Sequence, residues 1–288
     1  MTDLSDPRTT PARPDLADIR LKGRVEAQTF VEARPRRVAV ESAPLRRRPS
    51  PEAGLDTEAV MGEAAALYDE RDGFAFVQLL RDGYVGYLPS ESLGPADPEP
   101  DHRITAIRTF VYPAPDMKRP NRGHLGLGSK VHAHERSGDF LRVGEGLWVF
   151  AAHCEPLDRW APDWAGTAER LVGVPYLWGG RTSLGLDCSG LVQLCLELAG
   201  LPCPRDTDQQ ERALGARLPD DPEGLRRGDL VFWRGHVGLM LDAGTLIHAN
   251  GHHMAVAVEP LAGAIARIAE KSYGAVTAFR RITPSAAS

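Results

Sequence analysis

The sequence predicts an α+β protein in which two small β-rich blocks precede a larger domain. Short runs of β-branched and aromatic residues fill positions 37–158, and three prolines at positions 95–100 divide them. After Asp158 helical periodicity comes first and strand patterns come later, which favours helices packed on an antiparallel sheet. We therefore expect four segments: an N-terminal extension (1–36), two β blocks (37–97 and 98–158) and a C-terminal domain (159–288).

The extension has apolar residues but too few for a core of its own. Leu16, Ile19, Leu21, Val25 and Phe30 are spaced as in one or two helices that pack against a larger body. The composition as a whole, with 42% hydrophobic residues and a formal charge of -5, gives no general attraction to nucleic acid or to an anionic membrane. The basic run 34–48 is interpreted as a solvated strand edge and linker.

The two β blocks repeat each other faintly, at a constant offset in residue number. Strands are expected at 38–40, 64–68, 74–80 and 84–88, then at 104–112, 129–134, 140–143 and 147–150, with a turn at 81–83 making the third and fourth a hairpin. Residues 83–88 align with 144–149, and 90–93 with 151–154. The repeat predicts two small barrels of about 55 residues each. The alternative is a coincidence between short glycine-rich hairpins.

In the C-terminal domain a helix is expected at 164–172, capped by Asp163, and a second at 189–199, ended by Gly200. Strands follow at 230–233, 236–241, 245–250 and 255–258. Cys188 stands at the start of the second helix, where unpaired N–H groups and the helix dipole are expected to lower a thiol pKa and to stabilise an oxyanion. We interpret Cys188 as a nucleophile and Asp187 as the cap.

A cysteine nucleophile needs a base and a group that orients it. If residues 242–244 form a three-residue hairpin loop, paired residues have numbers that sum to 486, so His236 opposes Asn250 and His248 opposes Gly238. The two histidines then share one face of the sheet as diagonal neighbours.

Other chemistries have weaker support in the sequence. His132-Ala133-His134, His153-Cys154 and His252-His253 supply metal-ligand types without a recognised spacing, so no metal and no cofactor is expected. The glycines at 123–128 lack the setting of a nucleotide loop. The four cysteines form no CxxC pair, and no secretory signal or membrane span is evident, so the cytoplasm is the expected location.

Together these residues resemble the NlpC-type cell-wall cysteine peptidases, a papain-like family. The resemblance covers about residues 159–283 and is carried by Gly173-Val174-Pro175-Tyr176-Leu177-Trp178-Gly179-Gly180, by Asp187-Cys188-Ser189-Gly190, and by Gly228-Asp229-Leu230-Val231-Phe232-Trp233 with His236-Val237-Gly238. It implies Cys188 as nucleophile, His236 as general base and later acid, and His248 as the residue orienting that imidazole. Tyr176 would lie near the thiol, and Asp187 and Ser189 would contact substrate.

The paired β blocks add a second resemblance, because one branch of the family places two bacterial SH3-like barrels before the catalytic domain. Its members resemble dipeptidyl-peptidase VI enzymes, which cleave small murein peptides after L-Ala-γ-D-Glu and release L-lysine or meso-diaminopimelate at the head of the remainder. The resemblance nominates Glu63 and Tyr84 for the free amine of L-alanine, and Arg205, Asp206 and Gln209 for the substrate side of the cleft. The alternatives are a wall-peptide binding module with an inactive domain, and a related thiol amidase or acyltransferase.

Overall fold

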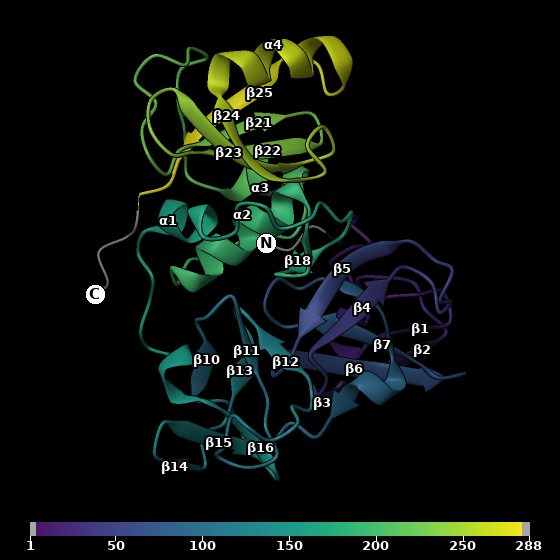
Figure 1. Ribbon diagram of the computed structural model, residues 1–288. Coiled ribbons are helices and arrows are strands. Elements are labelled where there is room, and N and C mark those ends of the chain that lie inside the picture. Colours follow the sequence, from purple (N-terminus) through teal and green to yellow (C-terminus); the bar gives the residue numbers. More distant parts are fainter. Residues whose placement is uncertain (1–3, 284–288) are drawn as a thin grey trace. The chain divides into compact units, whose positions relative to one another are not determined.

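The computed structural model describes residues 4–283, which form two compact units divided between Arg159 and Trp160 (Figure 1). Residues 1–3 of the predicted extension and 284–288 of the predicted C-terminal domain lie outside the described residues. Between residues 4 and 283, no helix has both the length and the apolar character that a membrane crossing needs.

The N-terminal extension contains short strands where the sequence predicts helices. β1 (Leu16–Asp18) pairs in parallel with β2 (Thr29–Val31), and a 3₁₀ turn, η1 (Ile19–Leu21), follows β1. Leu16 packs with Tyr68, Phe76 and Val85 of the first β block. The prediction of packing against a larger body is thus confirmed and the helix prediction is wrong, because apolar positions that fit a helical period also serve short extended segments covering a sheet.

The first β block forms a seven-stranded antiparallel sheet of order β5-β4-β8-β7-β6-β3-β9. Its strands are β3 (Arg34–Val38), β4 (Ser42–Arg46), β5 (Leu55–Val60), β6 (Ala64–Arg71), β7 (Phe74–Leu79), β8 (Val85–Pro89) and β9 (Leu93–Gly94). The expected hairpin is present, since Gln78 on β7 pairs with Val85 on β8. The core includes Leu45, Leu67, Val77, Leu79 and Leu88.

The second β block is made of smaller sheets. Its strands are β10 (His102–Ile104), β11 (Arg108–Phe110), β12 (His124–Gly126), β13 (Lys130–Val131), β14 (Glu135–Ser137), β15 (Phe140–Gly144), β16 (Leu147–Phe150) and β17 (Cys154–Pro156). The strand expected at 104–112 is interrupted between β10 and β11, and β11 joins β12 in a separate two-stranded sheet.

The repeat seen in the sequence reappears in the order of the elements. β8, the 3₁₀ turn η2 (Ser90–Ser92) and β9 correspond to β16, the 3₁₀ turn η3 (Ala151–His153) and β17. The pairing corresponds too, because β3 lies between β6 and β9, and β10 lies between β13 and β17. The sequence repeat is therefore also a repeat of local structure.

The C-terminal unit is a six-stranded sheet with helices on both faces. The helices are α1 (Trp164–Glu169), α2 (Cys188–Leu198), α3 (Thr207–Ala213) and α4 (Leu261–Lys271). The sheet, of order β20-β25-β21-β22-β23-β24, contains β20 (Ala216–Arg217), β21 (Leu230–Trp233), β22 (His236–Met240), β23 (Thr245–Asn250), β24 (Ala255–Pro260) and β25 (Val276–Arg281). A two-stranded ribbon, β18 (Arg181–Thr182) and β19 (Gly185–Leu186), precedes α2. Figure 1 shows α4 on one face of the sheet and α2 on the other, where α2 contacts β22 and β23.

The predicted register of the central hairpin is confirmed. Leu239 pairs with Ile247 and Met240 with Leu246, and both pairs have numbers that sum to 486. Asp163 caps α1 and Asp187 caps α2, as expected, although α1 ends at Glu169. α3, α4 and β25 were not predicted from the sequence. Leu261, Ala264 and Ile268 of α4 pack with Trp233, Met240 and Leu246, and so cover the face of the sheet that carries the two histidines.

Candidate active site

Cys188 is the first residue of α2, and its side chain is buried among polar groups. Its Sγ lies 3.8 Å from Oγ1 of Thr207, and the backbone N–H of Val237 on β22 stabilises the thiolate form. Thr207, at the start of α3, was not among the predicted site residues. Nothing in the local sequence marks it, because α3 brings it to the thiol from 19 residues away.

The carboxylate of Asp187 holds the start of α2 in place. It accepts N–H bonds from Gly190 (2.7 Å) and Gly179 (2.9 Å), and a hydroxyl bond from Ser189 (3.2 Å). The guanidinium of Arg205 completes the set with bonds of 2.6 and 3.0 Å to the two carboxylate oxygens. Asp187 is therefore an N-cap and an ion-pair partner at once.

The thiol pKa differs from the sequence expectation. Burial and the adjacent Asp187 carboxylate raise the pKa of Cys188 to about 11, and the contributions of the Val237 N–H, Thr207 and Arg205 that lower it do not compensate. The prediction of a lowered thiol pKa is wrong for the protein without substrate. It considered the helix dipole, whose effect is modest, and left out desolvation and the neighbouring carboxylate.

The two histidines lie together as the strand register predicts. Nε2 of His236 and Nδ1 of His248 are 2.8 Å apart, and both side chains are buried. Burial, with the neighbouring His248, lowers the pKa of His236 to about 3, and burial lowers that of His248 to about 3. Both rings are thus neutral at neutral pH, and the resting site holds a thiol and a neutral imidazole.

Glu259 and Arg267 extend the histidine pair, and the sequence analysis missed both. Oε1 of Glu259, on β24, lies 2.7 Å from Nε2 of His248 and also accepts a bond from Arg267 of α4. A carboxylate only accepts, so Nε2 of His248 donates to it and Nδ1 of His248 accepts from Nε2 of His236. Nδ1 of His236 is then the ring nitrogen that can take up a proton.

Two tyrosines complete the surroundings of the thiol. Tyr176 is half-buried in the loop before β18, and burial followed by the influence of Cys188 raises its pKa. Tyr273 stacks on His236 with ring centroids 5.2 Å apart and 4° between the planes, and its pKa is also raised by burial and by Cys188. Tyr273 follows α4, an element that the sequence analysis did not predict.

The other nominated residues of this unit differ in their exposure. Arg205 is only 1% exposed, and its guanidinium contacts Asp187, Ser189 and Gly180. Ser189 is also buried, whereas Asp206, at the N-cap of α3, and Gln209 are partly exposed. Arg205 is thus placed to hold Asp187, and its contact with substrate stays a prediction.

Glu63 and Tyr84 belong to the N-terminal unit. Glu63 is 3% exposed, pairs with Arg81 (2.6 Å) and accepts the N–H of Val60 (3.2 Å). Tyr84 belongs to the core of the first β block. The structure brings both into the same β block, and their role in amine recognition stays a prediction.

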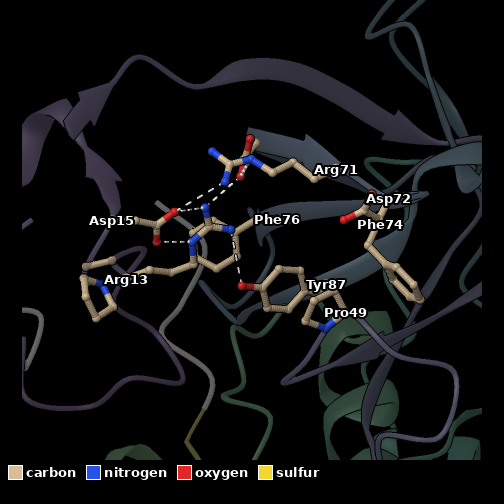
Figure 2. A pocket seen from close by; sticks show the side chains of 11 residues that line it. Arg13, Asp15, Pro49, Arg71, Asp72, Phe74, Phe76 and Tyr87 are labelled. Atoms are coloured by element: carbon tan, nitrogen blue, oxygen red, sulfur yellow. Dashed lines mark hydrogen bonds and ion pairs between the residues drawn. The ribbon is translucent and has the colours of Figure 1, made fainter. Parts of the chain in front are cut away.

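A pocket of about 560 Å³ lies in the N-terminal unit, where the extension meets the first β block. In Figure 2 the guanidinium of Arg13 lies over the ring of Phe76, 4.7 Å from its centroid, and bonds to Asp15 and Tyr87. The lining of this pocket contains none of the predicted site residues.

Comparison with known protein families agrees with this arrangement. Residues 173–271 match the NlpC/P60 family, and residues 45–93 match the bacterial dipeptidyl-peptidase SH3 domain. Residues 173–271 are thus a domain of the NlpC/P60 family. An N-terminal SH3 domain therefore precedes the NlpC/P60 domain. The NlpC/P60 match contains Cys188, His236, His248, Glu259 and Arg267, and the SH3 match contains Glu63 and Tyr84.

Two curated relatives of the chain have the same name, gamma-D-glutamyl-L-lysine dipeptidyl-peptidase. The one from Bacillus cereus (strain ATCC 10987 / NRS 248) is 25% identical in an alignment that covers 72% of this chain and 71% of the relative. The one from Bacillus subtilis (strain 168) is 36% identical in an alignment that covers 29% of this chain and 32% of the relative. The crystal structure of an NlpC/P60 family protein from Bacillus cereus ATCC 10987 has a similar fold, with a TM-score of 0.73 at 21% identity, over 87% of this chain and all of that one.

Proposed function

We propose that this NlpC/P60 protein is a cysteine peptidase that hydrolyses the bond between γ-D-glutamate and the following diamino acid in free murein peptides. The observation that carries the proposal is the line of hydrogen bonds from His236 through His248 to Glu259, together with a cysteine at a helix start whose sulfur meets the backbone N–H of Val237, the residue after His236. The name of the curated relatives supports the substrate class.

The reaction starts from the neutral pair. As Sγ of Cys188 attacks the γ-carbonyl carbon, its proton passes to Nδ1 of His236, and the carbonyl oxygen becomes an oxyanion. The first N–H groups of α2, which have no partner within the helix, and the hydroxyl of Tyr176 stabilise that oxyanion. The imidazolium then protonates the departing amine of the diamino acid, and a thioester links Cys188 to the γ-glutamyl carbonyl.

Water completes the turnover. His236 removes a proton from the water as it attacks the thioester, and the thiol leaves as the proton returns to sulfur. Because Glu259 fixes the tautomer of His248, and His248 fixes that of His236, the base presents the same nitrogen in both halves of the reaction.

We further propose that residues 98–158 form a second SH3-like barrel, supported by the correspondence between β8-η2-β9 and β16-η3-β17. The substrate would carry an unblocked L-alanine, whose amine Glu63 and Tyr84 recognise, and Asp206 and Gln209 would contact the rest of the peptide. Cytoplasmic peptide recycling is the proposed setting, since a free small peptide rather than intact wall is the substrate.

The test is product analysis by mass spectrometry with L-Ala-γ-D-Glu-meso-diaminopimelate, its L-lysine counterpart and the N-acetylated forms. We expect release of the diamino acid from the unblocked peptides, loss of activity in Cys188→Ala, and cleavage of acetylated peptides reduced at least tenfold. Equal cleavage of acetylated and free peptides would contradict amine recognition, and an active Cys188→Ala variant would contradict the mechanism. No cleavage with intact peptide binding would instead indicate a binding module, and transfer of the acyl group to an added amine would indicate an acyltransferase.

A further inference from the structure

The hairpin that carries His248 also brings a second imidazole, that of His253, close to Glu259. His253 lies in the turn between β23 and β24, and its ligand atom, that of His248 and that of Glu259 all lie within 4.8 Å of one another. His248 is buried, Glu259 is partly exposed and His253 is exposed. The cluster therefore reaches from the buried histidine pair to the solvent.

The donor set is one that transition metals prefer. Two imidazole nitrogens and one carboxylate oxygen suit Zn²⁺, with a water molecule as the fourth ligand, and do not suit Mg²⁺ or Ca²⁺, which take oxygen ligands. Donor atoms of a tetrahedral zinc site lie about 3.4 Å apart for metal–ligand distances of about 2.0–2.1 Å. Separations of up to 4.8 Å must therefore close by at most about 1.4 Å, and the exposed side chain of His253 on a turn can supply that movement.

A hydrogen bond to Asn250 leaves one ring nitrogen of His253 available to a metal. Its Nδ1 lies 3.0 Å from Oδ1 of Asn250, which can only accept, so Nδ1 donates and Nε2 keeps its lone pair. A metal-binding histidine commonly donates its other ring N–H to an oxygen in this way. The backbone N–H of His253 bonds to the same Oδ1 at 2.9 Å, so Asn250 holds both the turn and the ring.

We propose that His248, His253 and Glu259 form a binding site for Zn²⁺ or a similar divalent transition metal, and that occupation of this site switches off the base at His236.

The switch follows from the tautomers. Without metal, Nε2 of His248 donates to Glu259 and Nδ1 accepts from His236. A metal can bind Nε2 of His248 only when that nitrogen carries no proton, so the proton of the neutral ring moves to Nδ1, which then donates to Nε2 of His236. The proton of His236 must move to its Nδ1, the nitrogen that otherwise receives the thiol proton. Each ring keeps one proton, the metal contributes no redox step, and the base is blocked.

A metal at this site competes with the hydrogen bonds that Glu259 already accepts. Its Oε1 accepts from both His248 and Arg267, so the metal displaces one hydrogen bond and meets a neighbouring positive charge. Binding is therefore reversible and weaker than in a structural zinc site, where four protein ligands close around the ion. A reversible site of this kind suits inhibition by free metal.

Direct binding decides whether the site exists. Zn²⁺ is titrated calorimetrically into the untagged full chain carrying Cys188→Ala, so that the thiol cannot contribute. We expect one ion per chain, an affinity at least about tenfold lower when His253→Ala is added, and an unchanged affinity with His252→Ala, the neighbouring exposed histidine. No binding, or equal loss in the two histidine variants, would overturn the site.

The inhibitory half of the proposal rests on the proposed peptidase mechanism and has its own readout. Two chains that keep Cys188 are compared, the unchanged chain and the His253→Ala variant. For each chain, tripeptide hydrolysis and alkylation of Cys188 by iodoacetamide are measured with and without Zn²⁺, and each rate is divided by the metal-free rate of the same chain. We expect Zn²⁺, at a concentration that fills the site seen by calorimetry, to slow both reactions at least tenfold in the chain that keeps His253. In the chain with His253→Ala, the factor by which Zn²⁺ slows each reaction should be at least threefold smaller. Equal inhibition in the two chains would overturn the switch and assign the effect to the thiol. Calorimetry and alkylation decide these points even if the tripeptide is not a substrate.

Discussion

Replacing Arg205 with methionine should destabilise the C-terminal unit by about 3–5 kcal/mol, the usual cost of removing one partner of a buried ion pair. The guanidinium makes two bonds to Asp187 and one each to Ser189 and Gly180. Without Arg205, the Asp187 carboxylate keeps only two backbone N–H donors and the Ser189 hydroxyl among the bonds described above, and it lies in a nearly closed environment. Arg212→Met is the matched control, because its exposed pair with Asp208 is worth no more than about 1 kcal/mol.

The unfolding of this unit can be followed by a cysteine within it. Cys195 on α2 is fully buried, so its alkylation in a urea series, read by mass spectrometry, reports the opening of α2. The double variant Asp187→Asn with Arg205→Met should lose at least about 2 kcal/mol less than the sum of the single variants, because neither charge is then left unpaired. Additive losses, or a loss in Arg205→Met no larger than in the control, would refute the assignment of Arg205 to the support of Asp187.

Three further predictions concern the site. The alkylation rate of Cys188 should rise with pH from 6 to above 9, because its raised pKa of about 11 leaves little thiolate at neutral pH; a rate that is already level at pH 7 would contradict this. Glu259→Gln should lower kcat about tenfold with little change in KM, since the charge behind His248 is lost, and exposed Glu270→Gln should change neither in the same steady-state assay. Gly190→Ala should cost at least about 2 kcal/mol in the urea series, because the new Cβ would lie 2.3 Å from a backbone oxygen; an unchanged midpoint would show that the loop yields.

The sequence was sufficient wherever short-range rules decide the structure. A three-residue loop fixes a hairpin register, so the proximity of His236 and His248 could be worked out from residue numbers alone. The cap at Asp187 is equally local. The correspondence of β8, η2 and β9 with β16, η3 and β17 could be anticipated from the sequence repeat, since similar segments adopt similar local structure.

The missing parts of the site depend on contacts between distant segments. Glu259 acts on His248 only because β24 pairs with β23, and Arg267 and Tyr273 depend on how α4 crosses the sheet. The thiol pKa was misjudged for the same reason. A helix start is visible in sequence, whereas the closing of Thr207 and Val237 around the sulfur, which removes it from water, is a property of the folded unit.

Asp187 has two opposite effects on the nucleophile, and Arg205 is what balances them. The carboxylate fixes the helix start that positions Cys188, yet its negative charge raises the pKa of the thiol, while Arg205 lowers it. Loss of Arg205 should therefore slow the alkylation of Cys188 at pH 8, whereas simple loosening of the fold would expose the sulfur and speed it. The sign of the change separates the two explanations. Slower alkylation in Arg205→Met, restored when Asp187→Asn is added, would show that the ion pair sets the reactivity of the thiol as well as the stability of its helix, and faster alkylation would show that it serves packing alone.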